Sequence, residues 1–296
     1  MSVLSNPQGT PERVWSLVAG LAALGGSAER AAYDALLNPG FNKDGVDLKA
    51  NTSLAGNAHG AALSLKLVEA GRDRAALLVE PPLDFAAFAD HVHDRLINLT
   101  SGETDAPILD AFAWVAAESD RRGGLDWIYQ TGRDDFADLA NGALVGDDDD
   151  GKIMNPTKVV AWRRWLAFLG LGIALPFERT PDFPTPADRI TRELRRAGLA
   201  ANTSMGAGAF VALLAGRMPY LDKGRLFNQA CERIGHVPAT GRLSPLLSTA
   251  LRDLHDEGTI SLRPSGDAAE RLRLSEDSAH AIDAFSTVIC FPQAST

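Results

Sequence analysis

Residues 243–276 constrain the fold more than any other stretch of this 296-residue chain. Ser244 can cap a helix with its hydroxyl, and Pro245 suits the first helical position, where its missing N–H costs nothing. Gly258 suits the left-handed backbone that ends many helices. Between them, apolar side chains recur at helical spacing, at Leu246, Leu247, Ala250, Leu251 and Leu254. The stretch therefore begins with a predicted amphipathic helix.

Two short strands are predicted after this helix. Ile260 and Leu262 alternate with polar residues, as do Leu272 and Leu274 on the way back. Residues 264–267, Pro-Ser-Gly-Asp, are typical of a turn. A helix followed by two strands with a tip between them is the second half of a winged helix-turn-helix domain, and we expect that fold here.

A similar order of elements is predicted near the N-terminus. Helices from Pro11, over 27–37 and over 57–69 precede an apolar strand at 75–79. A second strand of the wing is hard to find in this region. The order nevertheless favours another winged-helix-like domain.

The middle of the chain is predicted to be helical and to end in a basic helix and a strand. The expected elements are helices at 84–99, 106–119 (capped by Asp105), 127–130, 134–139 and 158–170, and an apolar strand at 171–177. Helices at 188–197, 205–217 and 222–234 would open the last domain, and a helix at 278–285 would close it. The central order again resembles a winged helix.

Two proline-rich stretches divide the chain. Pro81 and Pro82 form a rigid break, and residues 176–186 form a proline-rich joint. We therefore expect three domains, at 1–82, 83–180 and 181–296. The predicted fold class is mainly α with short β-hairpins, arranged as tandem winged helix-turn-helix-like domains.

Charge is unevenly distributed along the chain, whose net charge is −9. Residues 85–150 contain four basic and fifteen acidic residues, whereas residues 151–220 contain ten basic and four acidic residues. The basic segment is either a local anion-binding face or a region that its acidic neighbour neutralises. No stretch has the roughly 18 apolar residues that a membrane span needs, and the N-terminus lacks the pattern of a secretory signal, so we expect a cytoplasmic protein without membrane contact.

Twelve basic residues are candidates for contact with double-stranded DNA: Lys158, Arg163, Arg164, Arg189, Arg192, Arg195, Arg196, Arg242, Arg252, Arg263, Arg271 and Arg273. A winged helix places its third helix in the major groove and its wing against phosphates or the minor groove. In the last domain, acidic residues such as Asp253, Asp256 and Glu257 are interleaved with the arginines and oppose phosphate contact. The helix with Lys158, Arg163 and Arg164 is therefore the better candidate. Use of these domains to bind proteins is the alternative.

The sequence does not indicate a reaction. An EF-hand reading of 146–157 fails because Gly146 and Thr157 stand where carboxylates are required. His91 and His93 would lie about 200° apart on a helix, too far round to share a metal. No nucleotide-binding fingerprint or catalytic motif is complete. We therefore expect no enzyme, cofactor or metal, and the role of the acidic segment 133–150 is open.

Three segments resemble the DpdG proteins: MSVLSNPQGTP at 1–11, MPYLDKG at 218–224 and LSPLLSTALRDLHDEG at 243–258. That family belongs to bacterial gene clusters that insert 7-deazaguanine derivatives into DNA and restrict unmodified DNA. The resemblance implies a non-catalytic DNA-binding or protein-scaffold subunit of an antiphage restriction complex, with helicase- or nuclease-like proteins as partners. It supplies no catalytic residues.

A stand-alone winged-helix transcriptional regulator is the alternative to that interpretation. Such a regulator would be a dimer on a palindromic DNA site. The sequence leaves the oligomeric state open, and a homo-oligomer is compatible with either function.

Overall fold

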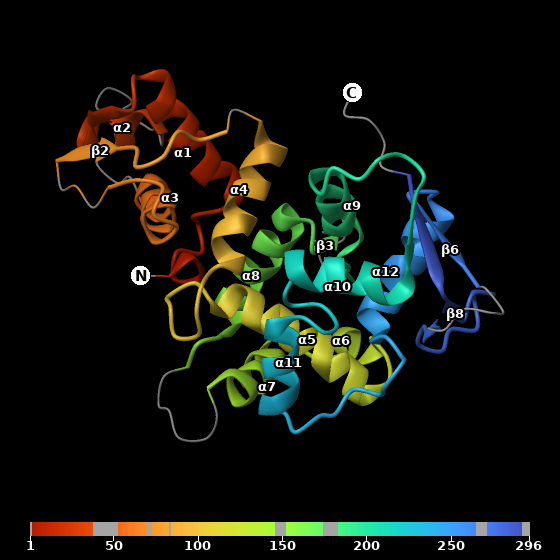
Figure 1. Ribbon diagram of the computed structural model, residues 1–296. Helices are drawn as coiled ribbons and strands as arrows, with labels where there is room; N and C mark the ends of the chain where they lie inside the picture. The colour runs from red at the N-terminus through yellow and green to blue at the C-terminus, as the bar shows by residue number, and fades with distance from the viewer. Residues whose placement is uncertain are drawn as a thin grey trace. The chain divides into compact units, whose positions relative to one another are not determined.

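The computed structural model describes residues 2–37, 53–69, 71, 73–82, 84–145, 152–173, 183–264 and 271–291. These residues are mainly helical with small antiparallel sheets, which confirms the predicted mainly α class (Figure 1). The chain divides into two compact units: unit 1 is Met1–Ile108 with Pro156–Leu169, and unit 2 is Leu109–Asn155 with Gly170–Thr296. The expected division into three domains concerns which segments fold independently, and it stays a prediction. The acidic run 147–150, the turn residues 265–267 and most of the joint 176–186 lie outside the described residues.

Unit 1 begins with six short elements: η1 (Val3–Ser5), α1 (Pro11–Ala23), β1 (Ser27–Glu29), α2 (Arg30–Leu37), α3 (Ser53–Ser64) and β2 (Arg74–Ala76). β1 and β2 pair antiparallel, with Ser27 opposite Ala76. A bridge between Val68 and Leu77 and a hydrogen bond from the Glu69 amide to the Ala76 carbonyl (2.9 Å) add a third extended segment. The sequence did not reveal this extended segment, because it is too short to show alternation.

The core of unit 1 contains aromatic side chains from α1, α4 (Phe85–Ile97) and α8 (Pro156–Leu169). The ring of Phe168 lies 5.0 Å from that of Phe85 and 5.6 Å from those of Phe88 and Trp165. Phe85 in turn lies 5.6 Å from Trp15 on α1. These contacts place residues distant in the sequence in one core and explain why α8 belongs to unit 1.

Asp105 has a different role from the predicted one. Its carboxylate accepts hydrogen bonds from the Ser2 hydroxyl (2.9 Å), the Val3 amide (2.8 Å) and the Ser64 hydroxyl, rather than from the backbone of the helix that follows. It thus connects the N-terminal residues to the end of α3. A pattern local in sequence predicted the cap, whereas a contact between distant segments occupies the carboxylate.

The first part of unit 2 is helical and also has an aromatic core. It consists of most of α5 (Pro107–Arg122), α6 (Asp126–Gln130) and α7 (Arg133–Leu144). Trp114, Trp127 and Phe136 pack with ring centroids 5.4–6.2 Å apart. From Asp84 to Leu169 the described residues contain helices but no strand, so a winged-helix order does not occur within this stretch. The next strand, β3 (Gly172–Ile173), pairs with β4 (Phe183–Pro184) across the expected boundary at 180/181.

The rest of unit 2 alternates helices and strands. Its elements are α9 (Ala187–Arg196), β5 (Thr203–Gly206), α10 (Ala207–Arg217), α11 (Arg225–Arg233), α12 (Pro245–Asp256), β6 (Ile260–Arg263), β7 (Leu272–Arg273), β8 (Ala284–Phe285) and β9 (Thr287–Cys290). One antiparallel sheet has the order β5-β9-β6, and a second joins β7 to β8. Figure 1 shows α12 beside the strands of this region.

The strands β6 and β7 were predicted to pair with each other, and this prediction was wrong. β6 pairs with β9, and β7 pairs with β8. The predicted closing helix at 278–285 is likewise absent, because residues 278–283 form a turn, a bend and irregular structure before β8. Ala284 and Phe285, which were expected to end that helix, are buried as strand residues instead.

Candidate functional site

The helix α12 is mostly buried, and its exposed residues are largely acidic. The predicted cap at Ser244 is confirmed, since its hydroxyl accepts a hydrogen bond from the Leu247 amide (3.3 Å). The buried residues are Pro245, Leu246, Leu247, Ser248, Ala250, Leu251, Arg252 and Leu254. Asp256 and the following Glu257 are exposed, and Asp253 is partly exposed. A DNA groove facing this side of α12 would therefore meet carboxylates.

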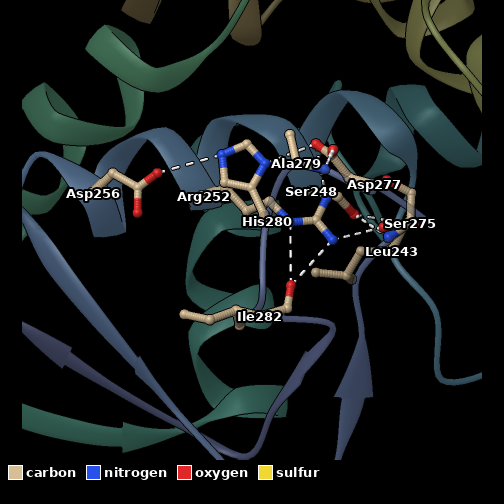
Figure 2. A network of polar contacts seen from close by, with 9 residues as sticks. All are labelled: Leu243, Ser248, Arg252, Asp256, Ser275, Asp277, Ala279, His280 and Ile282. Atoms are coloured by element: carbon tan, nitrogen blue, oxygen red, sulfur yellow. Dashed lines mark hydrogen bonds and ion pairs between the residues drawn. The ribbon is translucent and has the colours of Figure 1, made fainter.

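Arg252 is buried at the centre of a polar network (Figure 2). Its guanidinium donates to the Ser275 carbonyl (2.7 Å) and twice to the Ile282 carbonyl (3.2 Å each), and it lies 3.9 Å from the Asp277 carboxylate. The Ser248 hydroxyl accepts a hydrogen bond from the Ser275 amide (2.8 Å). Burial lowers the pKa of Arg252, which nearby Asp277 opposes. Arg252 was expected to contact DNA, but it is only 2% exposed and instead attaches residues 275–282 to α12.

His280 extends this network toward the end of α12. Figure 2 shows its ring between two carboxylates: Nδ1 lies 2.9 Å from Asp277 and Nε2 lies 3.4 Å from Asp256. Hydrogen bonds to Asp277, first from the Ala279 amide and then from His280, lower the pKa of that carboxyl group. The network therefore positions the chain that leads into β8.

The arginines of α9 are largely engaged within unit 2. Arg189 is fully buried, and its guanidinium lies 3.2 Å from Glu193. Glu193 also binds Arg196 (2.6 Å) and Arg217 (2.7 Å). Arg189 was expected to add to a DNA-binding surface, and its burial places it away from that surface. Burial depends on which face of the helix packs inward. Because the sequence of α9 is rich in charged residues, it gave no sign that Arg189 lies on the buried face.

The remaining arginines of α9 differ from each other. Arg192 forms an ion pair with Asp188 at 3.0 Å. Arg195 is exposed and lines a cavity between α9 and α12. The predicted basic stripe of α9 is thus divided between internal ion pairs and one exposed guanidinium in the cavity wall.

Four predicted arginines, which we call the strand arginines, are exposed beside β6 and β7: Arg242, Arg263, Arg271 and Arg273. Arg242 and Arg273 are joined by a β-bridge. Arg263 ends β6, where its carbonyl accepts a hydrogen bond from the Ser286 amide (3.0 Å), next to the β7–β8 pair. Two of the four have acidic neighbours, Arg242 with Asp120 at 3.4 Å and Arg271 with Asp283 at 3.7 Å. The structure therefore brings together arginines from three separate segments.

The basic residues of α8 lie in unit 1. Arg164 is exposed, whereas Lys158 and Arg163 are partly buried. Their neighbours Trp162 and Trp165 are in the core. The predicted division of α8 into an apolar face and a basic side is confirmed for these residues, except that Val160, expected inside, is 46% exposed.

Two buried carboxylates of unit 2 were not found by sequence reasoning. Asp120 on α5 lies 2.7 Å from His236 and 3.4 Å from Arg242, so it holds the two ends of the segment between α11 and α12. Asp222 accepts hydrogen bonds from the Ser244 amide and hydroxyl (2.6 Å each), which fixes the start of α12. Burial raises the pKa of Asp222, and the bonds from Ser244 oppose that shift. No local pattern marks either contact, because the partners are 22 or more residues apart.

A thiol near these carboxylates is poorly suited to nucleophilic catalysis. Burial, and after it the negative charges of Asp120 and Asp222, raise the pKa of Cys231 to about 12. The thiolate is the nucleophilic form of cysteine, and catalytic cysteines have lowered pKa values. Cys231 therefore behaves as a buried structural thiol despite having an aspartate–histidine pair in the same region.

The comparisons with known proteins identify the family of this chain. A family model described as DpdG-like matches residues 1–268. The chain belongs to the DpdG-like family. The match covers both units in large part and ends within the segment between β6 and β7. No curated protein and no solved structure matches the chain.

Membership of the DpdG-like family associates the chain with the Dpd system of 7-deazaguanine DNA modification. The resemblance predicted from three short segments is thereby confirmed. Among the described residues, no helix of this DpdG-like chain is long and apolar enough to cross a membrane.

Proposed function

We propose that this DpdG-like chain is a non-catalytic subunit of an antiphage DNA restriction complex, and that it binds double-stranded DNA and holds helicase- or nuclease-like proteins of the same system. The observation that carries the proposal is the separation of charge in unit 2. The strand arginines lie beside β6 and β7, whereas the exposed side of α12 is acidic. Two surfaces of opposite charge suit two different kinds of partner.

The order of elements supports a winged-helix interpretation of both parts of the chain that contain sheets. In unit 1, the order is α1, β1, α2, α3 and then the two segments that bridge at Val68 and Leu77. In unit 2, α9, β5, α10, α11 and α12 precede β6 and β9, and the last strand lies between the other two, as β5-β9-β6. We propose that these are two winged-helix modules, with β7 and β8 as an insertion in the wing of the second.

DNA contact through the second module would use its wing rather than α12, the helix that precedes the wing. Arginines at the wing can contact phosphates, which are the main source of affinity in DNA binding. α12 would instead meet DNA with Asp256 and Glu257, which repel phosphate. The acidic side of α12 is therefore assigned to a protein partner. The basic residues of α8 stay a second candidate for DNA contact.

The proposal is tested by affinity capture of the tagged chain from its native host, together with DNA binding of the purified chain at two salt concentrations. We expect co-purification of a helicase- or nuclease-like protein and DNA binding that weakens with salt. The matched variants are Arg263→Ala/Arg271→Ala/Arg273→Ala and Lys158→Ala/Arg163→Ala/Arg164→Ala, which each remove three positive charges. Loss of DNA binding in the first triple and not in the second assigns contact to the wing. A chain that neither binds DNA nor captures such a protein would contradict the proposal.

A stand-alone transcriptional regulator requires a helix that reads bases in the major groove. The acidic exposed residues of α12 weigh against that use. A dimer bound tightly to one palindromic sequence, without any co-purifying protein, would favour the regulator.

A further inference from the structure

A cavity of about 410 Å³ lies between α9 and α12 in unit 2. Most of its polar lining comes from the end of α12, from α9 and from the residue before β6: Asp188, Thr191, Arg195, Asp253, Glu257 and Thr259. Leu194 and the 52%-exposed side chain of Ile173 add apolar surface. A space of this size and composition can receive a long side chain with an apolar stem and a polar end.

The carboxylates in this cavity differ in whether they already have a cation. Asp188 forms its ion pair with Arg192. Asp253 and Glu257 form no ion pair with any described residue, although the neighbouring Asp256 contacts His280. Four residues apart, Asp253 and Glu257 lie on the same side of the helix. The cavity therefore contains two adjacent carboxylates that form no ion pair with a described residue.

The position of these carboxylates is unfavourable for the isolated chain. The C-terminus of a helix has a partial negative charge, which favours cations and disfavours acids there. Asp253, Asp256 and Glu257 nevertheless follow one another at the end of α12. His255 lies in the same turn, and its Nδ1 accepts a hydrogen bond from the Leu262 amide (3.3 Å). A ring nitrogen that accepts a hydrogen bond carries no proton. Burial and then the negative charge of Glu257 raise the pKa of Asp253, against the influence of His280.

We propose that the cavity between α9 and α12 binds an arginine or lysine side chain of a protein partner, with the cationic end between Asp253 and Glu257. The stem of the guest would pack on Ile173 and Leu194, and Thr259 in the lining offers a further hydroxyl. This inference names the chemistry of the partner on the acidic side of α12 and so rests on the protein-binding part of the proposed function. It accounts for acids that are placed at the negative end of a helix, since an external cation offsets their repulsion.

A metal ion fits this cavity less well than an organic cation. Among the described residues, Asp188, Asp253 and Glu257 do not form a group whose ligand oxygens all lie within 4.8 Å of one another. A guanidinium needs only two carboxylate oxygens and can use them with parallel hydrogen bonds. The negatively charged phosphates of DNA would be repelled by the carboxylates of this cavity.

The test measures binding of a fluorescent Gly-Arg-Gly peptide to the full chain by anisotropy. The same peptide with citrulline, which has the shape of arginine without its charge, is the ligand control. The variant Asp253→Asn/Glu257→Gln removes the two carboxylates. The matched variant Glu232→Gln/Glu276→Gln removes two exposed acids elsewhere in unit 2, so both variants change the net charge equally.

We expect the arginine peptide to bind and the citrulline peptide not to bind. Affinity should fall at least about tenfold in Asp253→Asn/Glu257→Gln, as for the loss of a charge-assisted hydrogen bond, and should be unchanged in the matched variant. Equal binding of the two peptides, or equal loss in the two variants, would overturn the inference. Stabilisation by Mg²⁺ alone that depends on Asp253 and Glu257 would overturn it too, in favour of a metal.

The peptide result is independent of the wider proposal. A chain that captures its partner through another surface, yet does not bind the arginine peptide, contradicts the inference and leaves the proposed function standing. A chain that captures no protein but binds the peptide through Asp253 and Glu257 contradicts the scaffold role instead.

Discussion

The helices α3 and α12 are each the last helix before the strands that complete the sheet in the two proposed winged-helix modules, yet they differ in their buried polar residue. α3 buries His59, 3% exposed, and neither ring nitrogen has a hydrogen-bond partner among the described residues. α12 buries Arg252, whose guanidinium donates to two carbonyl groups and approaches Asp277. α3 thus buries an imidazole that has no hydrogen bond to a described residue, whereas α12 uses a buried guanidinium to hold the chain that follows it.

The exposed sides of these helices differ as well. α3 contains no Asp, Glu, Lys or Arg in its sequence SLAGNAHGAALS. α12 ends with Asp253 and Asp256 and is followed by Glu257. A shared position before the strands therefore does not imply a shared partner, because affinity depends on the side chains at the surface. We expect the two modules to respond differently to mutation, salt and pH.

The largest difference should follow from Arg252→Ala. The change leaves the carbonyls of Ser275 and Ile282 without their donor and Asp277 without its buried cation. Loss of such a partner typically costs about 3 kcal/mol of unfolding free energy. Urea unfolding of the purified chain measures this cost. Hydrogen exchange of the amides in 272–285 then shows whether the loss is located in this segment. Arg263→Ala, on the exposed side of β6, should change the unfolding free energy by less than about 0.5 kcal/mol. Equal effects of the two changes would show that the network around Arg252 does not stabilise unit 2.

The next difference concerns DNA. Replacement of Arg263, Arg271 and Arg273 by alanine should lower affinity for a short duplex roughly 10- to 100-fold and reduce the slope of log affinity against log salt by about 3, if each contacts one phosphate. Titrations by anisotropy at several salt concentrations give both numbers. The α8 triple at Lys158, Arg163 and Arg164 is the control with equal charge. An unchanged slope in the first triple and a reduced one in the second would assign DNA contact to α8.

These tests address what sequence reasoning could and could not establish. The start of α12 was predictable, because Ser244 and Pro245 act on the backbone within three residues. Most helices were likewise found from local spacing. The strand partners of β6 and β7 were not predictable. Both partners lie within residues 284–290, which the sequence did not mark as strands. The burial of Arg189 and Arg252 was also missed. It results from the packing of the helices, which places Arg189 against Glu193 and Arg252 against Ile282, and the local sequence does not show that packing.

The two modules should respond to acid in opposite directions. Burial and then Arg30 lower the pKa of His59 below its usual 6.5, with Asp34 in opposition. The unfolded chain then binds a proton more readily than the folded one, so stability present above pH 6.5 is lost as pH falls through the folded pKa. Asp222 has a raised pKa, so its contribution is largest below its usual 3.8 and is lost as pH rises through the folded value.

Hydrogen exchange of α3 and α12, measured in steps from above pH 6.5 to below pH 3.8, separates these two effects. Protection of α3 should fall with acidification, and His59→Leu should remove that dependence while it leaves α12 unchanged. Asp222→Asn should flatten the opposite trend in α12, because the amide keeps an acceptor for the Ser244 amide without an ionisable group. Parallel trends in the two helices would mean that groups other than His59 and Asp222 control the response.

The smallest effect is expected at the acidic end of α12, and its sign is more informative than its size. Asp253→Asn/Glu257→Gln removes a like-charge pair four residues apart and two acids from the negative end of a helix. Each of these contributions is a few tenths of a kcal/mol, so the variant should be more stable than the parent by about 0.5–1 kcal/mol. The gain should shrink in high salt because these carboxylates are partly exposed. Thermal unfolding at low and high salt measures it, with Glu232→Gln/Glu276→Gln near zero in both. A loss of stability would mean that the two carboxylates support the fold of unit 2. A gain means that the chain retains them although they lower its stability, as expected for groups whose positive partner comes from another molecule.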